Sequence, residues 1–356
     1  MEDVKFDFDD ILIVSKKTHI KSRYKDILLP PSLPLFTAPM DTVINLDNVK
    51  NFIDNQIHIT LPRTIKYNDF LHSAIPLTNI FVSMGFNDLN FFYKENFKAF
   101  KTGQHLLIDV ANGHMQKIVD YATEIKRLRP DIVLMVGNIG SPDMYKWYAE
   151  NKCVDYIRIG IGNGGGCLTT KQSGIGYPMA SLIHETYKQK MDLMKSYEGE
   201  LSYYYNDFKL PKIVADGGMK NYSDIIKAHA LGADYVMIGS LFNKALESCA
   251  QNYLYGIKIG KKTANKLFGK GYPIKKYFRG MSTKDAQKAM GKTVFKTSEG
   301  VVRFRKVEYH LNGWVENYKH YLRNAMSYSN AKTLDDFIGK VNFCQITKNS
   351  YERFNK

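Results

Sequence analysis

The sequence has few cysteines and no long apolar run, and each absence excludes a class of protein. Only four cysteines occur among 356 residues, and no two of them form a Cys-x-x-Cys pair. We therefore expect neither a disulfide framework nor a cysteine-ligated zinc site. No apolar run reaches the roughly 18 residues that a transmembrane helix needs, and the segment Met1–Lys5 does not open a signal-peptide core. We expect a cytoplasmic protein with no membrane partner.

Acidic residues are also in deficit, and the deficit is local. The chain has 50 Lys and Arg against 35 Asp and Glu, a net charge of +15. Between Lys258 and Glu308 there are 15 Lys or Arg but only 3 Asp or Glu, which leaves +12 in this stretch alone. We interpret it first as a solvated, mobile insertion. Two alternatives stay open: a field that attracts phosphorylated ligands, and a nucleic-acid surface.

What the chain does contain is a regular alternation of short β-rich runs with stretches of helical character. A length of 356 residues with 44% hydrophobic side chains is enough for one large core. Alternating strands and helices predict parallel strands, and eight of them favour an α/β fold of the (β/α)8 TIM-barrel type over an open sheet. We expect one such domain over residues 1–356. The predicted strands are Leu35–Ala38, Ile57–Leu61, Asn79–Met84, His105–Ala111, Asp131–Gly137, Val154–Ile159, Lys212–Asp216 and Ala233–Gly239.

Two connections are longer than is usual in such a barrel. They are Tyr187–Leu210 and Asn252–His310, and the second carries the basic excess as an insertion after the eighth strand. Helices are then expected around Trp314–Met326 and Thr333–Val341, followed by a strand-like Asn342–Thr347. Polar and glycine-rich turns follow the barrel strands, which predicts an active site where the strands end.

One cysteine lies in a setting that suits chemistry. Cys167 follows five glycines in the run 160–171. Glycines allow a backbone to approach a ligand closely, and a thiolate beside free backbone N–H groups can attack an electrophilic carbon. The alternative is a flexible loop with a small buried thiol. Cys153, Cys249 and Cys344 are interpreted as core thiols.

A set of ordered motifs resembles the IMP dehydrogenase/GMP reductase family, and its GMP reductase branch more closely. The motifs are Phe8–Ile13, Lys21–Arg23, Pro39–Val43, Asp109–Gly113, Gly137-Asn138, the cysteine loop through Pro178, Asp216–Gly218, Gly232–Asp234, Gly280–Ser282 and Ser298–Gly300. The resemblance runs nearly end to end and implies the same barrel.

Three features favour the reductase branch. The Asp109–Gly113 sequence is similar to the reductase pattern, the flap between Met281 and Glu299 is short, and the flap lacks the Arg-Tyr pair with which dehydrogenases activate water. No inserted regulatory domain is found. The second candidate is an NAD-dependent IMP dehydrogenase that oxidises IMP to XMP. A candidate of another class is a non-catalytic nucleotide- or nucleic-acid-binding barrel, although nucleic acid is not the partner we expect.

The activity that the resemblance implies belongs to purine nucleotide metabolism and salvage. It is the NADPH-dependent reductive deamination of GMP, or of a related purine nucleotide, to IMP and ammonia through a covalent thioimidate on Cys167. Thr169 and Glu299 match the pair that handles the proton of the leaving amine.

The resemblance also implies binding residues and a homotetramer. The nucleotide would contact Asp216, Gly217, Gly218, Gly239, Ser240, Met281, Ser282 and Lys296. The cofactor would contact Asp109, Val110, Ala111, Asn112, Gly113 and Asn138, with Gly137 beside them. A monovalent cation, usually potassium, would be held by the backbone carbonyls of Gly162, Gly164 and Cys167.

The cysteine loop departs from the family pattern. It has Asn163-Gly164-Gly165 where relatives have Pro-Gly-Ser, so a phosphate-binding hydroxyl is missing at Gly165. Leu168 replaces a threonine, and Thr170 and Lys296 replace arginines. We hypothesise that the basic insertion folds toward the phosphate and compensates for the missing hydroxyl.

Overall fold

A closed parallel barrel forms the centre of the molecule. The computed structural model describes residues 4–73, 75, 79–200, 209–294 and 300–354. Eight strands form one sheet in the order β2-β9-β8-β7-β6-β5-β4-β3. The two outermost strands of this order are joined by a parallel bridge between Phe36 and His58, and the His58 N–H donates to the Leu35 carbonyl at 2.9 Å. The predicted (β/α)8 barrel is therefore confirmed.

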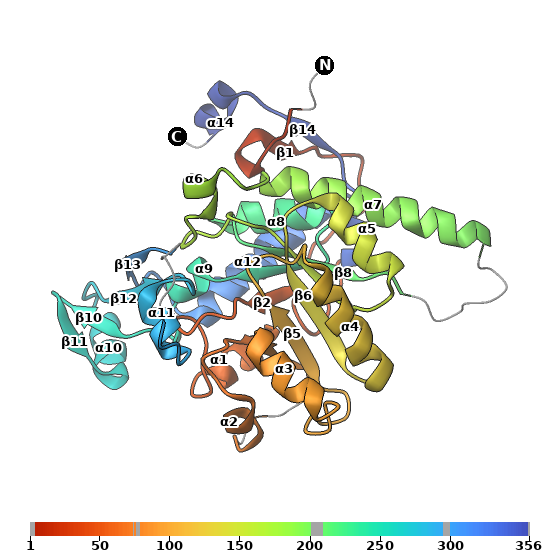
Figure 1. The fold of residues 1–356 in the computed structure, drawn as a ribbon. Coiled ribbons are helices and arrows are strands. Elements are labelled where there is room, and N and C mark those ends of the chain that lie inside the picture. Colours follow the sequence, from red (N-terminus) through yellow and green to blue (C-terminus); the bar gives the residue numbers. More distant parts are fainter. Residues whose placement is uncertain (1–3, 74, 76–78, 201–208, 295–299, 355–356) are drawn as a thin grey trace.

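The barrel strands end within two residues of their predicted bounds. They are β2 (Leu35–Thr37), β3 (Ile59–Leu61), β4 (Ile80–Met84), β5 (His105–Asp109), β6 (Val133–Ile139), β7 (Tyr156–Ile159), β8 (Lys212–Asp216) and β9 (Tyr235–Ile238). Figure 1 shows helices around them, namely α1 (Val49–Asp54), α2 (Tyr67–Leu71), α3 (Phe86–Lys94), α4 (Gln116–Leu128), α5 (Pro142–Glu150), α6 (Thr169–Ser173), α7 (Met179–Glu200), α8 (Tyr222–Leu231), α9 (Ser240–Asn243) and α12 (Leu311–Tyr328).

Large side chains fill the inside of the barrel. Phe36 and Phe81 pack edge to face with ring centroids 5.6 Å apart, and Tyr156 lies 5.4 Å from Phe81 in the same way. Buried Leu107 and Met237 complete this cluster. Because the interior is packed with side chains, the barrel offers ligands its mouth and no through-channel.

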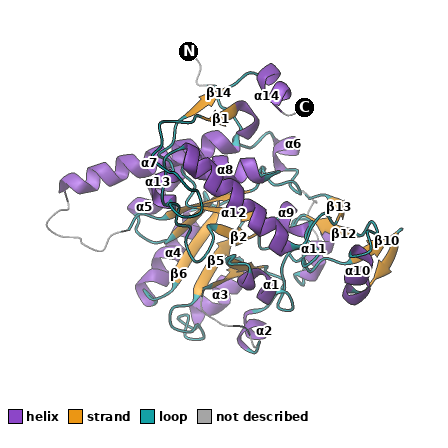
Figure 2. Ribbon diagram, turned by 180° about the vertical axis from the view of Figure 1, so that it is seen from behind, coloured by secondary structure: helices purple, strands orange, loops and turns teal. Residues whose placement is uncertain are grey.

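The two ends of the chain pair with each other outside the barrel. Strand β1 (Ile11–Ile13), which follows the 3-10 helix η1 (Phe8–Asp10), is antiparallel to β14 (Phe343–Gln345). The short helices α13 (Leu334–Phe337) and α14 (Lys348–Phe354) flank β14 in sequence. Figure 2 shows this pair beyond α7 and α8, with α14 close to it. In the described part of the chain, no helix is long and apolar enough to cross a membrane.

Two expectations need correction. Residues from Tyr187 to Glu200 are not a loop but the continuation of α7, whose Leu193 is buried. Cys344 is exposed on β14, so its assignment as a core thiol was wrong, whereas Cys153 is buried and Cys249 is partly buried. Strand β14 has only three residues and lies at the edge of the molecule, so the chain does not bury both of its faces. This explains why the Cys344 thiol is exposed.

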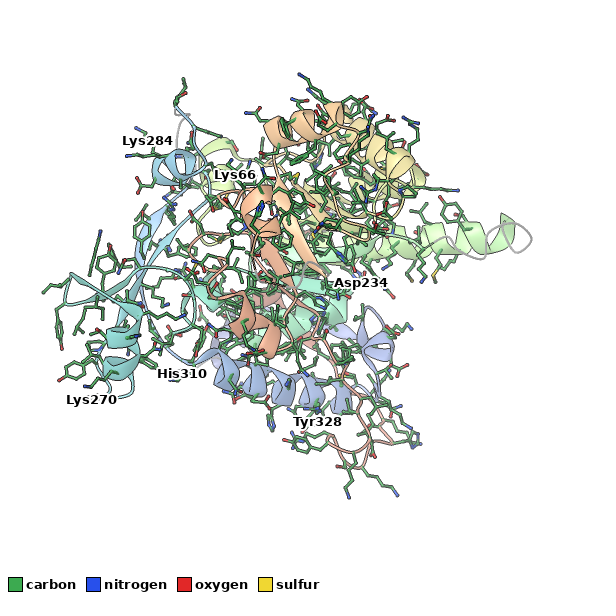
Figure 3. All side chains as sticks on the ribbon, turned by 90° about the horizontal axis from the view of Figure 1, so that it is seen from below. Lys66, Asp234, Lys270, Lys284, His310 and Tyr328 are labelled. Atoms are coloured by element: carbon green, nitrogen blue, oxygen red, sulfur yellow. The ribbon has the colours of Figure 1, made fainter. Side chains whose placement is uncertain are left out.

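The basic insertion, residues 252–310, is called the arm. It contains β10 (Asn252–Leu254), β11 (Ile257–Ile259), α10 (Lys261–Phe268), β12 (Lys275–Arg279), α11 (Lys284–Ala289) and β13 (Val302–Lys306). Its strands form an antiparallel sheet in the order β11-β10-β12-β13. Figure 3 shows Lys270 and Lys284 on the arm and His310 where the chain returns to α12.

The arm has a small core of its own. Ala264, Ile274 and Val307 are buried together with Leu246 of the barrel side. The described residues of the arm thus form a paired sheet over an apolar cluster, and most of its lysines, such as Lys258, Lys261 and Lys262, are exposed, as expected for a solvated insertion.

Lys276 contributes to the net charge of the arm but does not lie on its surface. Its side chain is fully buried, and its ammonium donates to the carbonyls of Leu246 at 2.9 Å and Ser248 at 2.5 Å. Burial lowers the pKa of Lys276 to about 8. This lysine therefore holds the arm to the chain that follows α9, and it does not contribute to a basic surface.

Replacing Lys276 should destabilise the fold. Lys276→Ala leaves two buried carbonyls without their donor and opens a cavity, so we expect the free energy of unfolding to fall by about 2 to 4 kcal/mol. Lys275→Ala, on the exposed neighbouring side chain, is the control and should stay within about 0.5 kcal/mol. Urea unfolding followed by circular dichroism measures both. Equal effects of the two substitutions would contradict the structural role.

Candidate active site

A pocket of about 870 Å³ lies where the barrel strands end. This volume is typical of small-molecule sites. Its walls come from the ends of β5, β6, β8 and β9, from the glycine run after β7 and from β12 and β13 of the arm. The turns that the sequence places after separate strands thus meet around one space.

Cys167 lies at this pocket with a hydroxyl beside it. Its Sγ is 3.1 Å from Oγ1 of Thr169, the first residue of α6. Its N–H donates to the Gly164 carbonyl at 2.9 Å, which closes a tight turn. The thiol is partly buried, so a ligand in the pocket can reach it while its backbone is held.

The cysteine loop is joined to the arm by backbone hydrogen bonds. Cys167 forms an antiparallel bridge with Gly300, and the Val301 N–H donates to the Gly166 carbonyl at 3.1 Å. The Gly280 N–H donates in turn to the Val301 carbonyl at 3.1 Å. The arm therefore forms a wall of the pocket and fixes the loop that carries the thiol.

Most of the predicted site residues line this one pocket. Those of the expected nucleotide side are Asp216, Gly217, Gly218, Gly239, Ser240, Met281 and Ser282; those of the cofactor side are Asp109, Val110, Ala111, Asn112 and Asn138; those of the cation site are Gly162, Gly164 and Cys167. Thr169 lines it as well. Glu299 and Lys296 lie outside the described residues.

Gly113 and Gly137 do not belong to the pocket lining. The Gly113 N–H donates to the Asn138 carbonyl at 2.7 Å. A Cβ on Gly137 would lie 2.5 Å from Cβ of Arg158. Both glycines thus allow neighbouring backbones to approach each other behind the pocket.

Two arginines that the sequence analysis missed neutralise Asp109. Arg158 Nη2 lies 2.5 Å from one carboxylate oxygen, and Arg63 Nε lies 2.9 Å from the other. Burial raises the pKa of Asp109, but the two guanidinium groups outweigh it and the pKa lies below its ordinary value. The signal in the sequence was Arg158 itself, a charged residue inside the otherwise apolar β7.

Asp216 lies between the two sides of the pocket. Asn138 Nδ2 donates to its carboxylate at 2.9 Å, and Arg158 Nε is 3.7 Å away. Burial raises the pKa of Asp216 above its usual range, against the opposing effects of Arg158 and Asn138. Since Asp216 and Asp109 share Arg158, the two carboxylates are electrostatically linked.

The backbone carbonyls expected to hold a cation are partly engaged. The Gly164 carbonyl already accepts from the Cys167 N–H, which leaves one lone pair for an ion. Neutral oxygen ligands of this kind suit a hard monovalent cation. Among the described residues, no group of three or more His, Cys, Asp or Glu side chains is placed to hold a metal ion.

The comparison with known proteins follows this geometry. A family model described as "IMP dehydrogenase / GMP reductase domain" matches residues 101–354. The chain belongs to this family. The GMP reductase of Caenorhabditis elegans is 27% identical over 98% of this chain and 94% of its own length. The GMP reductase of Buchnera aphidicola is 27% identical (99% and 98%), and human GMP reductase 2 is 26% identical (97% and 95%). The resemblance read from the motifs is confirmed.

The contact between the cysteine loop of this chain and its arm can be tested by a substitution at Gly280. A Cβ there would lie 2.5 Å from the Gly166 carbonyl oxygen. We expect Gly280→Ala to separate the two segments and to speed exchange of the Val301 amide by roughly 10-fold or more, as local opening becomes easier. Hydrogen exchange with mass spectrometry on the peptide after Gly300 measures this.

The control for Gly280→Ala is Gly313→Ala. Gly313 is in α12 with nothing within 4 Å of an added Cβ, so this substitution should leave Val301 exchange unchanged and raise stability by about 0.5 to 1 kcal/mol. Unchanged exchange in Gly280→Ala would show that the backbone contact is not needed.

Proposed function

We propose that this chain is an NADPH-dependent GMP reductase-like oxidoreductase that converts GMP, or a related purine nucleotide, to IMP and ammonia. The observation that carries the proposal is the Cys167 thiol, 3.1 Å from the Thr169 hydroxyl in a pocket of about 870 Å³. The similarity to proteins named GMP reductase over nearly their whole length supports the same activity.

The proposed reaction replaces the 2-amino group of the purine by hydrogen, in two steps at C2. The Cys167 thiolate forms a bond to C2 of the purine, and the 2-amino group leaves as ammonia once it has been protonated, so a thioimidate remains on the sulfur. NADPH, when bound, supplies the hydride that reduces C2. The C–S bond then breaks and returns the thiolate, with IMP as the product. Covalent catalysis of this kind lowers the barrier of each separate step.

The leaving amine needs a proton, and Thr169 is placed to pass one. Its hydroxyl lies against Sγ, beside the atom that attacks C2. In this proposal Glu299 is the residue that supplies the proton through Thr169. A hydroxyl can relay a proton because it donates and accepts at the same oxygen.

The nucleotide side of the pocket offers both a carboxylate and backbone donors. Asp216 accepts hydrogen bonds from the ribose hydroxyls, since a carboxylate binds a diol by charge-assisted hydrogen bonds. Gly217-Gly218 and Gly239-Ser240 follow the last two barrel strands, and such turns bind phosphate in barrels of this type. Met281 and Ser282 border the base.

The cofactor side is the wall formed by residues 109–112 and Asn138. The neutralised Asp109 lies at its base, with Arg63 also in the lining. A volume of about 870 Å³ and this polar wall fit a nicotinamide beside a nucleotide. On the basis of the family resemblance, the proposal also includes NADPH in place of NADH, a homotetramer and a cytoplasmic location. It further includes a potassium ion bound by the backbone carbonyls of Gly162, Gly164 and Cys167.

The first test removes the nucleophile. Cys167→Ala should lower kcat by at least roughly 10³-fold and leave the Kd for GMP near its starting value, because the sulfur is needed for bond formation and contributes little to binding. Loss of NADPH absorbance with GMP measures turnover, and calorimetry measures binding. IMP with NAD is the parallel assay for the dehydrogenase reaction.

Cys344→Ala removes an exposed thiol that does not line the pocket and is the matched control. It should retain full turnover. Near-normal turnover in Cys167→Ala, or turnover of IMP with NAD alone, would refute the proposed reaction.

A second test concerns the proton. Glu299→Gln keeps the shape of the side chain and removes its acid, so kcat should fall by roughly 10²-fold or more while the Kd for GMP hardly changes. Thr169→Val, with the same shape and no hydroxyl, should reproduce the defect. A variant whose sole change is weaker GMP binding would contradict the role in ammonia departure.

A further inference from the structure

Arg305 of β13 reaches the cysteine loop from the arm. Its Nη2 lies 3.3 Å from the position that a Cβ on Gly165 would occupy. Its guanidinium carbon lies 4.1 Å from the centroid of the Phe278 ring, in a cation–π contact. Arg305 also lines the pocket. Phe278 thus supports the guanidinium from one side, and the bare backbone of Gly165 borders it on another.

This guanidinium differs from those of Arg63, Arg158 and Arg279, which pair with carboxylates. The pocket lining also includes Arg303 of β13, which is exposed, whereas Arg305 is partly buried. Arg63 and Arg158 bind Asp109, and Arg279 binds Asp41. No carboxylate in the described part of the chain pairs with Arg305, and its buried Nε has no hydrogen-bond partner there. The acid nearest in sequence, Glu308, pairs with Lys244 at 3.0 Å.

The electrostatic consequence is an uncompensated, partly buried cation. Burial, followed by repulsion from Arg303, lowers the pKa of Arg305, while Glu308 opposes this shift. A guanidinium stays charged at neutral pH in any case. A positive charge held in this way costs free energy unless a ligand compensates it.

Other donors face the same space. A Cβ on Gly217 would lie 2.9 Å from the Gly164 backbone nitrogen, so Gly164 and Gly165 lie between the Gly217-Gly218 turn and Arg305. Lys220 and Lys244 also line the pocket, but each has a carboxylate partner, Asp9 at 3.1 Å and Glu308 at 3.0 Å. Unlike these two lysines, Arg305 pairs with no carboxylate among the described residues, and unlike Arg303 of the same lining it is partly buried, so its charge is available to a ligand.

We propose that Arg305 binds the phosphate of the purine nucleotide, and that residue 165 is glycine because the guanidinium occupies the space of a side chain there. This rests on the proposed function, whose substrate is a nucleoside monophosphate. A planar guanidinium can hold two phosphate oxygens at once. The hypothesis that the basic insertion compensates for the hydroxyl missing at Gly165 thereby becomes a hypothesis about one residue of β13.

The central test compares Arg305→Met with Lys306→Ala. Met retains an unbranched apolar stem over Phe278 and removes the donors. Lys306 is the next residue of β13, exposed, outside the pocket lining and on the opposite face of the strand. Arg305→Met should raise KM for GMP roughly 10- to 100-fold with kcat and KM for NADPH nearly unchanged. Lys306→Ala should change none of them.

The phosphate itself is tested with guanosine. In calorimetry the parent should prefer GMP to guanosine, and Arg305→Met should lose most of that preference while its Kd for guanosine stays the same. Arg305→Lys keeps a positive charge without the planar guanidinium, so its preference for GMP over guanosine should lie between those of the parent and Arg305→Met. Thermal unfolding confirms that the variants are folded, and Arg305→Lys keeps the comparison valid if Met destabilises the arm.

Gly165→Ser gives an independent test of the shared space. In the parent the added side chain displaces the guanidinium and should raise KM for GMP. In Arg305→Met the same serine has room and can donate to the phosphate, so it should lower KM. Effects of opposite sign in the two backgrounds are expected, because residues in contact are not additive.

The outcomes separate the two proposals. An active parent whose KM for GMP is unaffected by Arg305→Met overturns the role of Arg305 and leaves the proposed function standing. A raised KM for NADPH in place of GMP also overturns it. A parent without turnover overturns the proposed function, and the preference for GMP over guanosine in Arg305→Met then still decides whether Arg305 binds phosphate.

Discussion

The backbone pairing between the cysteine loop and the arm is the constraint on which the site depends. Gly166 and Cys167 pair with Gly300 and Val301, and Gly280 closes the arrangement from the end of β12. An isolated glycine loop would sample many conformations, because glycine loses more backbone entropy on ordering than any other residue. A paired edge reduces that freedom and gives the thiol one position. The barrel supplies the loop, and the arm holds it.

Charge is distributed unequally around the pocket. On the side of Asp109 the arginines and carboxylates neutralise each other, and the pKa of Asp109 is lowered as a result. On the side of Gly165, Arg305 lies against the Phe278 ring and Gly165 and pairs with no carboxylate in the described part of the chain. A neutralised wall suits an uncharged reacting group, and an unpaired guanidinium suits an anion. In the binding mode that we propose, this asymmetry orients the nucleotide with its phosphate toward the arm.

Not all positively charged side chains of the arm lie on its surface. The stretch carries +12, yet Lys276 is buried as a structural donor, Arg279 is paired with Asp41, and Arg305 faces the pocket. These three side chains are all positively charged, but their structural roles differ. Each role depends on the partner that the fold brings to the side chain, and none of the partners is a sequence neighbour.

The barrel, the glycine turns at the strand ends and the cysteine within the glycine loop could be predicted from the sequence alone. These are local properties: strand and helix alternate along the chain, turn residues follow directly after strands, and Cys167 and Thr169 are two residues apart. Three features became visible only in the folded structure: Arg158 and Arg63 share Asp109, α7 continues through residues 187–200, and Arg305 occupies the space beside Gly165. Each of the two contacts joins residues far apart in the chain, and the long helix is stabilised by its packing against α5 and α8. Packing between distant segments leaves no periodic signal in a single sequence, so these features follow from the closed barrel and the docked arm.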